Sequence, residues 1–348
     1  MTPYPKLTKT INPQPQARIY GLEYLRAIAC IFVVAFHASP ILMDFWYAKK
    51  LHVFVFAAAV PIFILISLFL TELKGANKDY ISQKTYRLGK IYLLWAWFIP
   101  LLVYLIYKFV ANPQDNFMAL INNQSIYELI INGPNFPFKV YGVYFLVYLI
   151  VLSWFYYILR QQMKTYSQVI RWTIFLGAIN LALPFLPESY KIIRESLLAF
   201  LIYLPLTKML YLDYQRKIAW QPKAVKFGVL YVVTAILEAV AISLSEQLPL
   251  ITYRYSPYGR LSIVFLAVCS IYLAFGMTQK TAAKVKLLKQ ISRSSLGIYL
   301  IHGFIIDYFR NIDHDFLPAL FFMIILLVSL SLSALIKNTA YVKQILTL

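Results

Sequence analysis

The first apolar segment carries an arginine and a histidine whose spacing places both on one side of a helix. Arg26 and His37 lie in GLEYLRAIACIFVVAFH, residues 21–37, separated by roughly three helical turns and about 16 Å along the axis. Ionisable groups are costly inside a bilayer, so within an apolar segment they are candidates for function. This face combines an anion anchor with a titratable imidazole, and Glu23, one turn before Arg26, is positioned to orient the guanidinium. The competing interpretation is a snorkelling arginine and a histidine that bonds to a neighbouring helix.

A second set of cations precedes the third apolar segment. Lys84, Arg87 and Lys90 follow one another at intervals of three residues, so in a helix they form one basic ridge. Arginine binds phosphate through two parallel hydrogen bonds and lysine through a point charge, which suits a phosphorylated ligand. The alternative is the ordinary positive charge that flanks membrane helices on the cytoplasmic side.

A late apolar segment contributes the third candidate set. Tyr299 and His302 lie three positions apart in SSLGIYLIH, residues 294–302, and share a helix face. We assign them a supporting role, with a hydrogen-bonded structural histidine as the alternative. Lys208 and Glu238 belong to two other segments, and we expect them to pair with each other as a structural ion pair.

Several catalytic and nucleotide-binding motifs are missing from the sequence. It has no GxxxxGK[ST] phosphate loop, no GxSxG nucleophile elbow and no HExxH zinc motif. The two cysteines, Cys30 and Cys269, have neither the pattern of a disulfide framework nor metal-ligand spacing. We therefore expect no metal, no bound cofactor and no hidden soluble nucleotide-binding domain.

Composition determines the elements that position these residues. Of the 348 residues, 61% are hydrophobic and only 14% are charged, and the mean hydropathy is +0.66. A soluble domain of this length could not hide so many apolar side chains, whereas a bilayer takes the place of water. The predicted fold class is all-α, a polytopic integral membrane bundle that forms one domain over residues 1–348.

About ten transmembrane helices are predicted, because each crossing needs about 20 apolar residues. The segments are 21–43, 51–71, 88–110, 140–159, 172–187, 194–212, 227–245, 261–278, 294–312 and 316–336. The segment 172–187 is short and ends in Pro184 and Pro187, so whether it spans fully is left open.

The loops between these segments alternate in basic charge. Most of the 33 Lys and Arg residues fall in the tail 1–20, in alternate loops and in the C-terminal tail. Short basic loops stay in the cytoplasm, so both termini are predicted to be cytoplasmic. The stretch 111–138 has no lysine or arginine and is the longest predicted outer loop. The net charge of +19 is thereby explained by topology and by anionic membrane lipids, and nucleic acid is not an expected partner.

These residues resemble the membrane acyltransferase-3 family. Its opening helix is similar in carrying an arginine, ten residues and then a histidine, and VYFL at 143–146 and SLGIYLIH at 295–302 extend the resemblance over essentially the whole chain. Within the family the chain looks most similar to the stand-alone type of the intercellular-adhesion polysaccharide O-acyltransferase or export-type protein. It departs from the family pattern at Lys84, where the first arginine of Arg-x-x-Arg is usual, and at Lys90, where proline is common.

The resemblance implies an enzyme that moves an acetyl, succinyl or related acyl group from cytoplasmic acyl-CoA, with acetyl-CoA as the expected co-substrate. The implied acceptor is a sugar hydroxyl of an exported surface polysaccharide or of its lipid-linked precursor. The implied location is the plasma membrane, in a bacterium the inner membrane, with a polysaccharide synthase complex as a further partner.

The resemblance also implies residue roles. His37 is the essential histidine, Arg26 is its helix partner, and Lys84, Arg87 and Lys90 bind the donor phosphates. His37 as a direct base and a transient acyl group on His37 remain alternatives. Arg26 and Tyr299 remain alternative donors to the oxyanion.

A polysaccharide exporter or flippase without acyl-transfer activity is the main competing function, and a non-catalytic synthase partner is the third. A translocation path is expected to show acidic or repeat-related sites rather than an imidazole three turns above an arginine. The acyl group, the acceptor hydroxyl and the oligomeric state are left open by the sequence.

Overall fold

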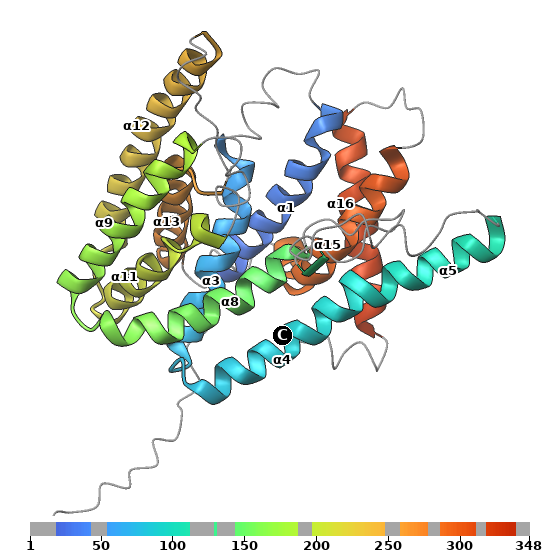
Figure 1. The fold of residues 1–348 in the computed structure, drawn as a ribbon, viewed down its shortest axis with the longest axis horizontal. Coiled ribbons are helices and arrows are strands. Elements are labelled where there is room, and N and C mark those ends of the chain that lie inside the picture. Colours follow the sequence, from blue (N-terminus) through green and yellow to red (C-terminus); the bar gives the residue numbers. More distant parts are fainter. Residues whose placement is uncertain are drawn as a thin grey trace, which may run out of the picture.

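The computed structural model describes residues 19–42, 54–111, 129–130, 143–186, 197–247, 258–277, 286–310 and 318–338. All the elements formed by these residues are helical (Figure 1). The predicted all-α class is therefore confirmed for the described residues. Most of the predicted tail 1–20 and of the predicted outer loop 111–138 lies outside them.

Each of the ten predicted segments overlaps one or more helical elements of the described residues. The α-helices are α1 (Tyr20–Leu42), α3 (Ala59–Leu73), α4 (Lys78–Leu93), α5 (Ile99–Ala111), α8 (Tyr144–Leu159), α9 (Tyr166–Ala182), α11 (Tyr203–Gln215), α12 (Trp220–Gln247), α13 (Leu261–Phe275), α15 (Lys286–Arg310) and α16 (Pro318–Asn338). Shorter turns are η1 (Phe56–Ala58), η3 (Arg160–Gln162), η4 (Leu183–Phe185) and η6 (Leu197–Phe200), and the π-helical segment η2 (Leu94–Phe98) joins α4 to α5. Figure 1 shows α4 and α5 continuing as one long helix along an edge of the bundle, with α8 beside α4.

Seven helical stretches of the described residues are long and apolar enough to cross a membrane. They are Tyr20–Ala38, Phe56–Leu73, Lys78–Ile106, Tyr144–Gln162, Tyr166–Phe185, Leu197–Gln215 and Trp220–Leu244. Two shorter apolar helices are Leu261–Phe275 and Phe322–Leu335. The surface of α12 exposes a band of large apolar side chains, as a lipid-facing helix does: Val229, Val232, Val233, Ile236 and Leu237. The chain is thus a multi-pass helical membrane protein, and ten crossings stay a prediction.

The segment predicted at 172–187 begins earlier than expected. Thr165 and Gln168 form a capping box that starts α9 at Tyr166. With the turn η4, the helical stretch reaches Phe185 and is 20 residues long. This length is sufficient for a full crossing.

Loops that were predicted to share a side of the membrane do meet. Arg160, from the predicted inner loop after α8, donates to the carbonyl oxygens of Gly75 and Ala76 at 2.6 and 2.8 Å. At the other end, Tyr144 donates to the hydroxyl of Tyr258 at 3.0 Å. These contacts agree with the predicted alternation of loops, while the end that faces the cytoplasm stays a prediction.

A tight turn joins α3 to α4 and determines where the basic residues of α4 lie. Gly75 has φ +85°, a left-handed conformation that glycine adopts without strain. The N–H of Gly75 donates to the carbonyl of Glu72, and the N–H of Ala76 donates to that of Thr71, which is the Schellman pattern. Asn77 then caps α4 by accepting from the N–H of Tyr80 at 2.8 Å. The turn brings the start of α4 back beside the end of α3.

Close packing in the interior brings α15 against α1 and α16. Gly297 has no room for a Cβ because the side chain of Ser333 on α16 occupies that space. On the other side, the thiol of Cys30 on α1 points to the carbonyl oxygen of Ser295 at 3.8 Å. Small residues at such crossings let membrane helices approach each other closely. This contact positions α1 and α15 so that their histidines can meet.

The predicted pairing of Lys208 with Glu238 is wrong. Lys208 Nζ lies 2.5 Å from Glu72 Oε1 on α3, and Glu238 Oε2 lies 2.7 Å from Arg260 Nη2. Each acid has a nearer cation on a neighbouring helix, because α3 packs against α11 and Arg260 stands at the start of α13 beside α12. Both residues therefore form ion pairs, but not with each other.

Candidate functional site

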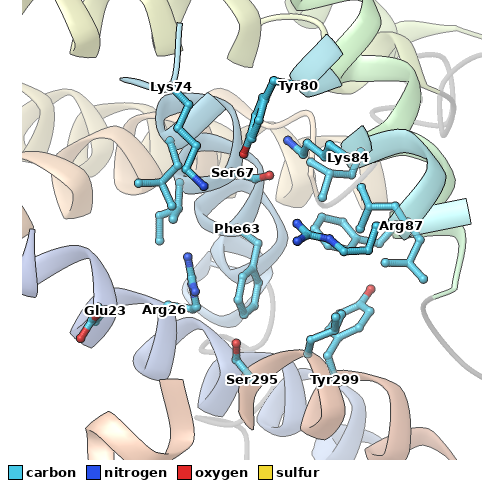
Figure 2. Close-up of a pocket in the computed structure, with 17 residues that line it drawn as sticks. Glu23, Arg26, Phe63, Ser67, Lys74, Tyr80, Lys84, Arg87, Ser295 and Tyr299 are labelled. Atoms are coloured by element: carbon cyan, nitrogen blue, oxygen red, sulfur yellow. The ribbon is translucent and has the colours of Figure 1, made fainter. Parts of the chain in front are cut away.

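A cavity of about 510 Å³ lies between α1, α3, α4, α8 and α15. This volume falls within the range of small-molecule sites. Four cations line the cavity, namely Arg26 on α1, Lys74 directly after α3, and Lys84 and Arg87 on α4. Glu23 is the one carboxylate among the described lining residues. Figure 2 shows the charged ends of the four cations directed toward a common space.

The cations on α4 are partly or wholly shielded from water. Lys84 is only 7% exposed, and its Nζ donates to Thr71 Oγ1 at 2.9 Å. Arg87 Nε is buried and has no hydrogen-bond partner among the described residues. A shielded ionic donor is costly until an anion binds it. The arrangement therefore favours a ligand with several negative charges, and phosphate groups meet this requirement.

Neighbouring helices hold these cations in place. Thr71, which accepts from Lys84, donates in turn to the carbonyl oxygen of Ser67 at 2.7 Å. Farther along α4, Thr85 Oγ1 accepts from the indole N–H of Trp154 on α8 at 3.0 Å. Lys84 is thus held by a side chain of α3, and the helix that carries the cations is held by a side chain of α8.

The remaining wall of the cavity is apolar and aromatic. Phe63, Phe145 and Tyr299 contact one another, with ring centroids 5.3 to 6.3 Å apart. Aliphatic side chains complete the lining: Ile66, Leu70, Leu88, Leu146, Leu149 and Leu296. A ligand that has both charged and uncharged parts fits such a cavity.

The predicted essential histidine lies beside the cavity but is not one of its lining residues. His37 is half-buried on α1, with its ring 5.1 Å from the ring of His302. His302 is fully buried, and its ring lies 5.8 Å from that of Tyr299, which lines the cavity. Tyr299, His302 and His37 therefore form a continuous row that begins at the cavity wall.

The predicted basic ridge is divided by the structure. Lys84 and Arg87 line the cavity, whereas Lys90 lies on the exposed side of α4, with its Nζ 4.2 Å from the centroid of the Tyr86 ring. Residues at i, i+3 and i+6 spread over about 120° of a helix surface, so the third member turns away. The other predicted residues Glu23, Arg26 and Tyr299 all line this one cavity.

Sequence reasoning gave no role to four polar residues that line the cavity: Ser67, Lys74, Tyr80 and Ser295. Lys74 was counted only as basic loop charge, although its Nζ lies 5.2 Å from the centroid of the Tyr80 ring. The signal was present in Lys-Gly-Ala-Asn at 74–77, where a glycine C-cap and an asparagine N-cap stand two residues apart. That pattern predicts a tight turn, which holds Lys74 beside the next helix.

The fold and the site define a multi-pass membrane protein with a charged internal cavity and, beside it, the buried His302 and the half-buried His37. The family model of the acyltransferase-3 domain, described as Acyltransferase domain, matches residues 19–337, and the chain belongs to this family. It is accordingly a membrane acyltransferase. No curated protein and no solved structure matches the chain.

Proposed function

We propose that this acyltransferase moves an acetyl or related acyl group from cytoplasmic acyl-CoA to a sugar hydroxyl. The proposed acceptor is an exported polysaccharide or its lipid-linked precursor at the plasma membrane. The observation that carries the proposal is the cationic cavity together with the row of side chains that runs from Tyr299 through His302 to His37. The cavity suits a phosphorylated donor, and the imidazoles suit deprotonation of an alcohol.

The donor accounts for the excess of positive charge in the cavity. Coenzyme A carries phosphates on its ADP part, while its pantetheine arm is largely uncharged. Arg26, Lys74, Lys84 and Arg87 supply charges for the phosphates, and the apolar lining receives the arm. Hydrogen bonds to charged groups contribute about 1.5–3 kcal/mol each. A donor with several phosphates therefore gains far more from this cavity than a neutral acyl donor does.

The chemistry needs a base for the hydroxyl and a hydrogen-bond donor for the oxyanion. In the proposed reaction His37 takes the hydroxyl proton as the oxygen attacks the thioester carbon. Tyr299, which lines the cavity and contacts His302, donates to the oxyanion. Arg26 lies about 16 Å from His37 along α1, too far to serve the same carbonyl, and is left to the phosphates. The C–S bond then breaks and the thiolate of coenzyme A leaves. A route through an acyl group on His37 itself is the alternative, and both routes need this histidine.

The sidedness of the substrates follows from the predicted topology. Lys74, Lys84 and Arg87 belong to the turn and helix that Arg160 contacts, where the predicted cytoplasmic loops meet. A cytoplasmic donor reaches this end first. His37 lies about three turns farther along α1 from Arg26, toward the side from which an exported glycan is approached.

Mass analysis of the surface glycan tests the proposal. Cells that carry the wild type or Lys90→Ala, which alters a cation outside the cavity, should make esterified polymer. Cells that carry His37→Ala should make polymer without these esters. Unchanged ester content with His37→Ala would refute an acyltransferase that uses this base. Polymer trapped inside the cell, with esters intact on any exported chains, would favour the polysaccharide exporter instead.

A further inference from the structure

His302 has a defined protonation pattern that its surroundings impose. The residue is fully buried in α15, and its Nδ1 lies 3.1 Å from the carbonyl oxygen of Ile298. A carbonyl oxygen only accepts hydrogen bonds, so Nδ1 carries the proton of the neutral ring. The other ring nitrogen, Nε2, is then a bare lone pair.

This lone pair is an unused acceptor in the interior of the bundle. Nε2 of His302 is buried and has no hydrogen-bond partner among the described residues. Buried polar atoms without a partner are rare, and an active site is one place where they are retained. Nε2 of His302 can therefore accept a hydrogen bond from a donor that reaches it during the reaction.

His37 is the ring best placed to supply that donor. The two imidazoles have centroids 5.1 Å apart and planes inclined by 44°. With nitrogens at the rims of both rings, this separation allows an N–H···N contact of about 3 Å after a modest rotation. The terminal torsion of histidine is broad, so a rotation about it brings nitrogens of the two rings toward each other.

We propose that His302 is the proton acceptor for His37, so that the two histidines act as a relay. The proposal rests on the proposed acyl transfer and deepens it by assigning His302 a task. As the acceptor O–H bond breaks and the new C–O bond forms, the proton passes to one nitrogen of His37. His37 releases the proton of its other nitrogen to Nε2 of His302. When the C–S bond breaks, the electron pair stays on sulfur.

The relay then runs in reverse to complete the reaction. The proton held by His302 returns through His37 to the thiolate, which leaves as the thiol of coenzyme A. The balance is one thioester and one alcohol converted into one ester and one thiol, with no oxidant or reductant. In this relay His302 acts only through His37.

Nitrogen-15 NMR of histidine-labelled protein in nanodiscs tests the required acceptor without any substrate. The chain has only four histidines, so His302 can be assigned from the signals that survive in His37→Gln, His52→Gln and His314→Gln. The expected shifts are those of a ring with Nδ1 protonated and Nε2 bare. A proton on Nε2 would leave the relay without its acceptor and overturn the proposal.

Kinetics of His302→Gln separate a relay from a merely orienting role. The glutamine amide can accept a hydrogen bond from His37 but cannot take its proton. With acetyl-CoA as donor and unesterified glycan from cells carrying His37→Ala as acceptor, kcat should fall about 100-fold. The KM for acetyl-CoA should change less than about twofold, since the cavity cations are untouched.

The outcomes distinguish the relay from the proposed function. Wild-type kcat in His302→Gln, with His37→Ala inactive, would overturn the relay and leave the acyltransferase proposal intact. Wild-type turnover in both variants would overturn both. If the thermal unfolding midpoint of His302→Gln equals that of the wild type, a loss of kcat is not due to misfolding. If the variant is unstable, the tautomer of His302 measured in the wild type decides whether the relay has its acceptor.

Discussion

Two regions of this membrane protein shield arginine from water, and they differ in how the charge is balanced. In the cluster at the start of α13, Arg260 is 1% exposed, and its Nε and Nη2 lie 2.8 and 2.7 Å from Glu238 Oε2. The carboxylate of Glu238 also accepts from the backbone N–H and the hydroxyl of Ser262. Cation and acid are therefore matched one to one within the protein.

The cavity has four cations and one lining carboxylate among the described residues. Among the described residues, Nε of Arg87 in this cavity has no hydrogen-bond partner. A balanced buried pair is a feature of structure, whereas an unbalanced group of cations is prepared for an external anion. The partners of a buried charge, rather than burial itself, therefore separate a structural role from a binding role.

The largest effect on stability is expected from Glu238→Ala. It leaves Arg260 buried without its acid, and breaking such a pair costs about 3–5 kcal/mol. Unfolding of the purified protein in detergent, followed by heat or denaturant, measures the loss. The double variant Glu238→Ala, Arg260→Met should recover much of it. Wild-type stability in Glu238→Ala would contradict a structural role for the Arg260–Glu238 pair.

A smaller loss is expected from Glu72→Ala. Glu72 pairs with Lys208 and Arg160, whose side chains are 12% and 27% exposed. Because water can reach these cations when the acid is gone, the loss should be about 1–3 kcal/mol. The same unfolding measurement compares it with Glu238→Ala. A loss equal to that of Glu238→Ala would show that exposure of the partner cation does not moderate the cost.

Thr71→Val tests whether the hydroxyl that holds Lys84 contributes to donor binding. The substitution removes the hydroxyl that accepts from Lys84, which should cost about 1 kcal/mol of stability and weaken acetyl-CoA binding about threefold. The matched control is Thr173→Val, since Thr173 also donates to a carbonyl one turn earlier but has no lysine partner among the described residues. Equal donor affinities in the two variants would contradict a positioning role for Thr71.

The smallest effect is expected from Lys90→Ala. Lys90 is exposed, and its Nζ lies over the face of the Tyr86 ring. Its removal should change stability by less than about 0.5 kcal/mol and leave donor affinity unchanged. Titration with acetyl-CoA checks this, and a marked loss of affinity would restore the three-membered ridge that the sequence predicted.

Hydropathy and motif spacing predicted the helical elements and several of the residues that line the cavity. The ten apolar segments all became helices because a run of apolar residues in lipid has few alternatives to helix. The helix start at Tyr166 was missed because its capping box lies among polar residues that hydropathy ignores. Lys208 was given the wrong partner because helix spacing within one segment says nothing about which helices become neighbours.

The site shows the same limit. Arg26, Lys84 and Arg87 were found from their types and spacing, and they line one cavity. The contact between His37 and His302 depends on the packing of α1 against α15, where Gly297 admits Ser333. No local pattern contains that information, because it arises from the way distant segments pack. The stand-alone subtype and the polysaccharide acceptor likewise stay predictions.

Binding of acetyl-CoA to the purified protein tests the central claim most directly, namely that the cavity cations hold the donor. Calorimetric titration should show Arg87→Ala weakened by about 10- to 150-fold, the equivalent of one charge-assisted hydrogen-bond set at 1.5–3 kcal/mol. Lys90→Ala, on the same helix but outside the cavity, should match the wild type. Equal dissociation constants for the wild type and Arg87→Ala would contradict the claim.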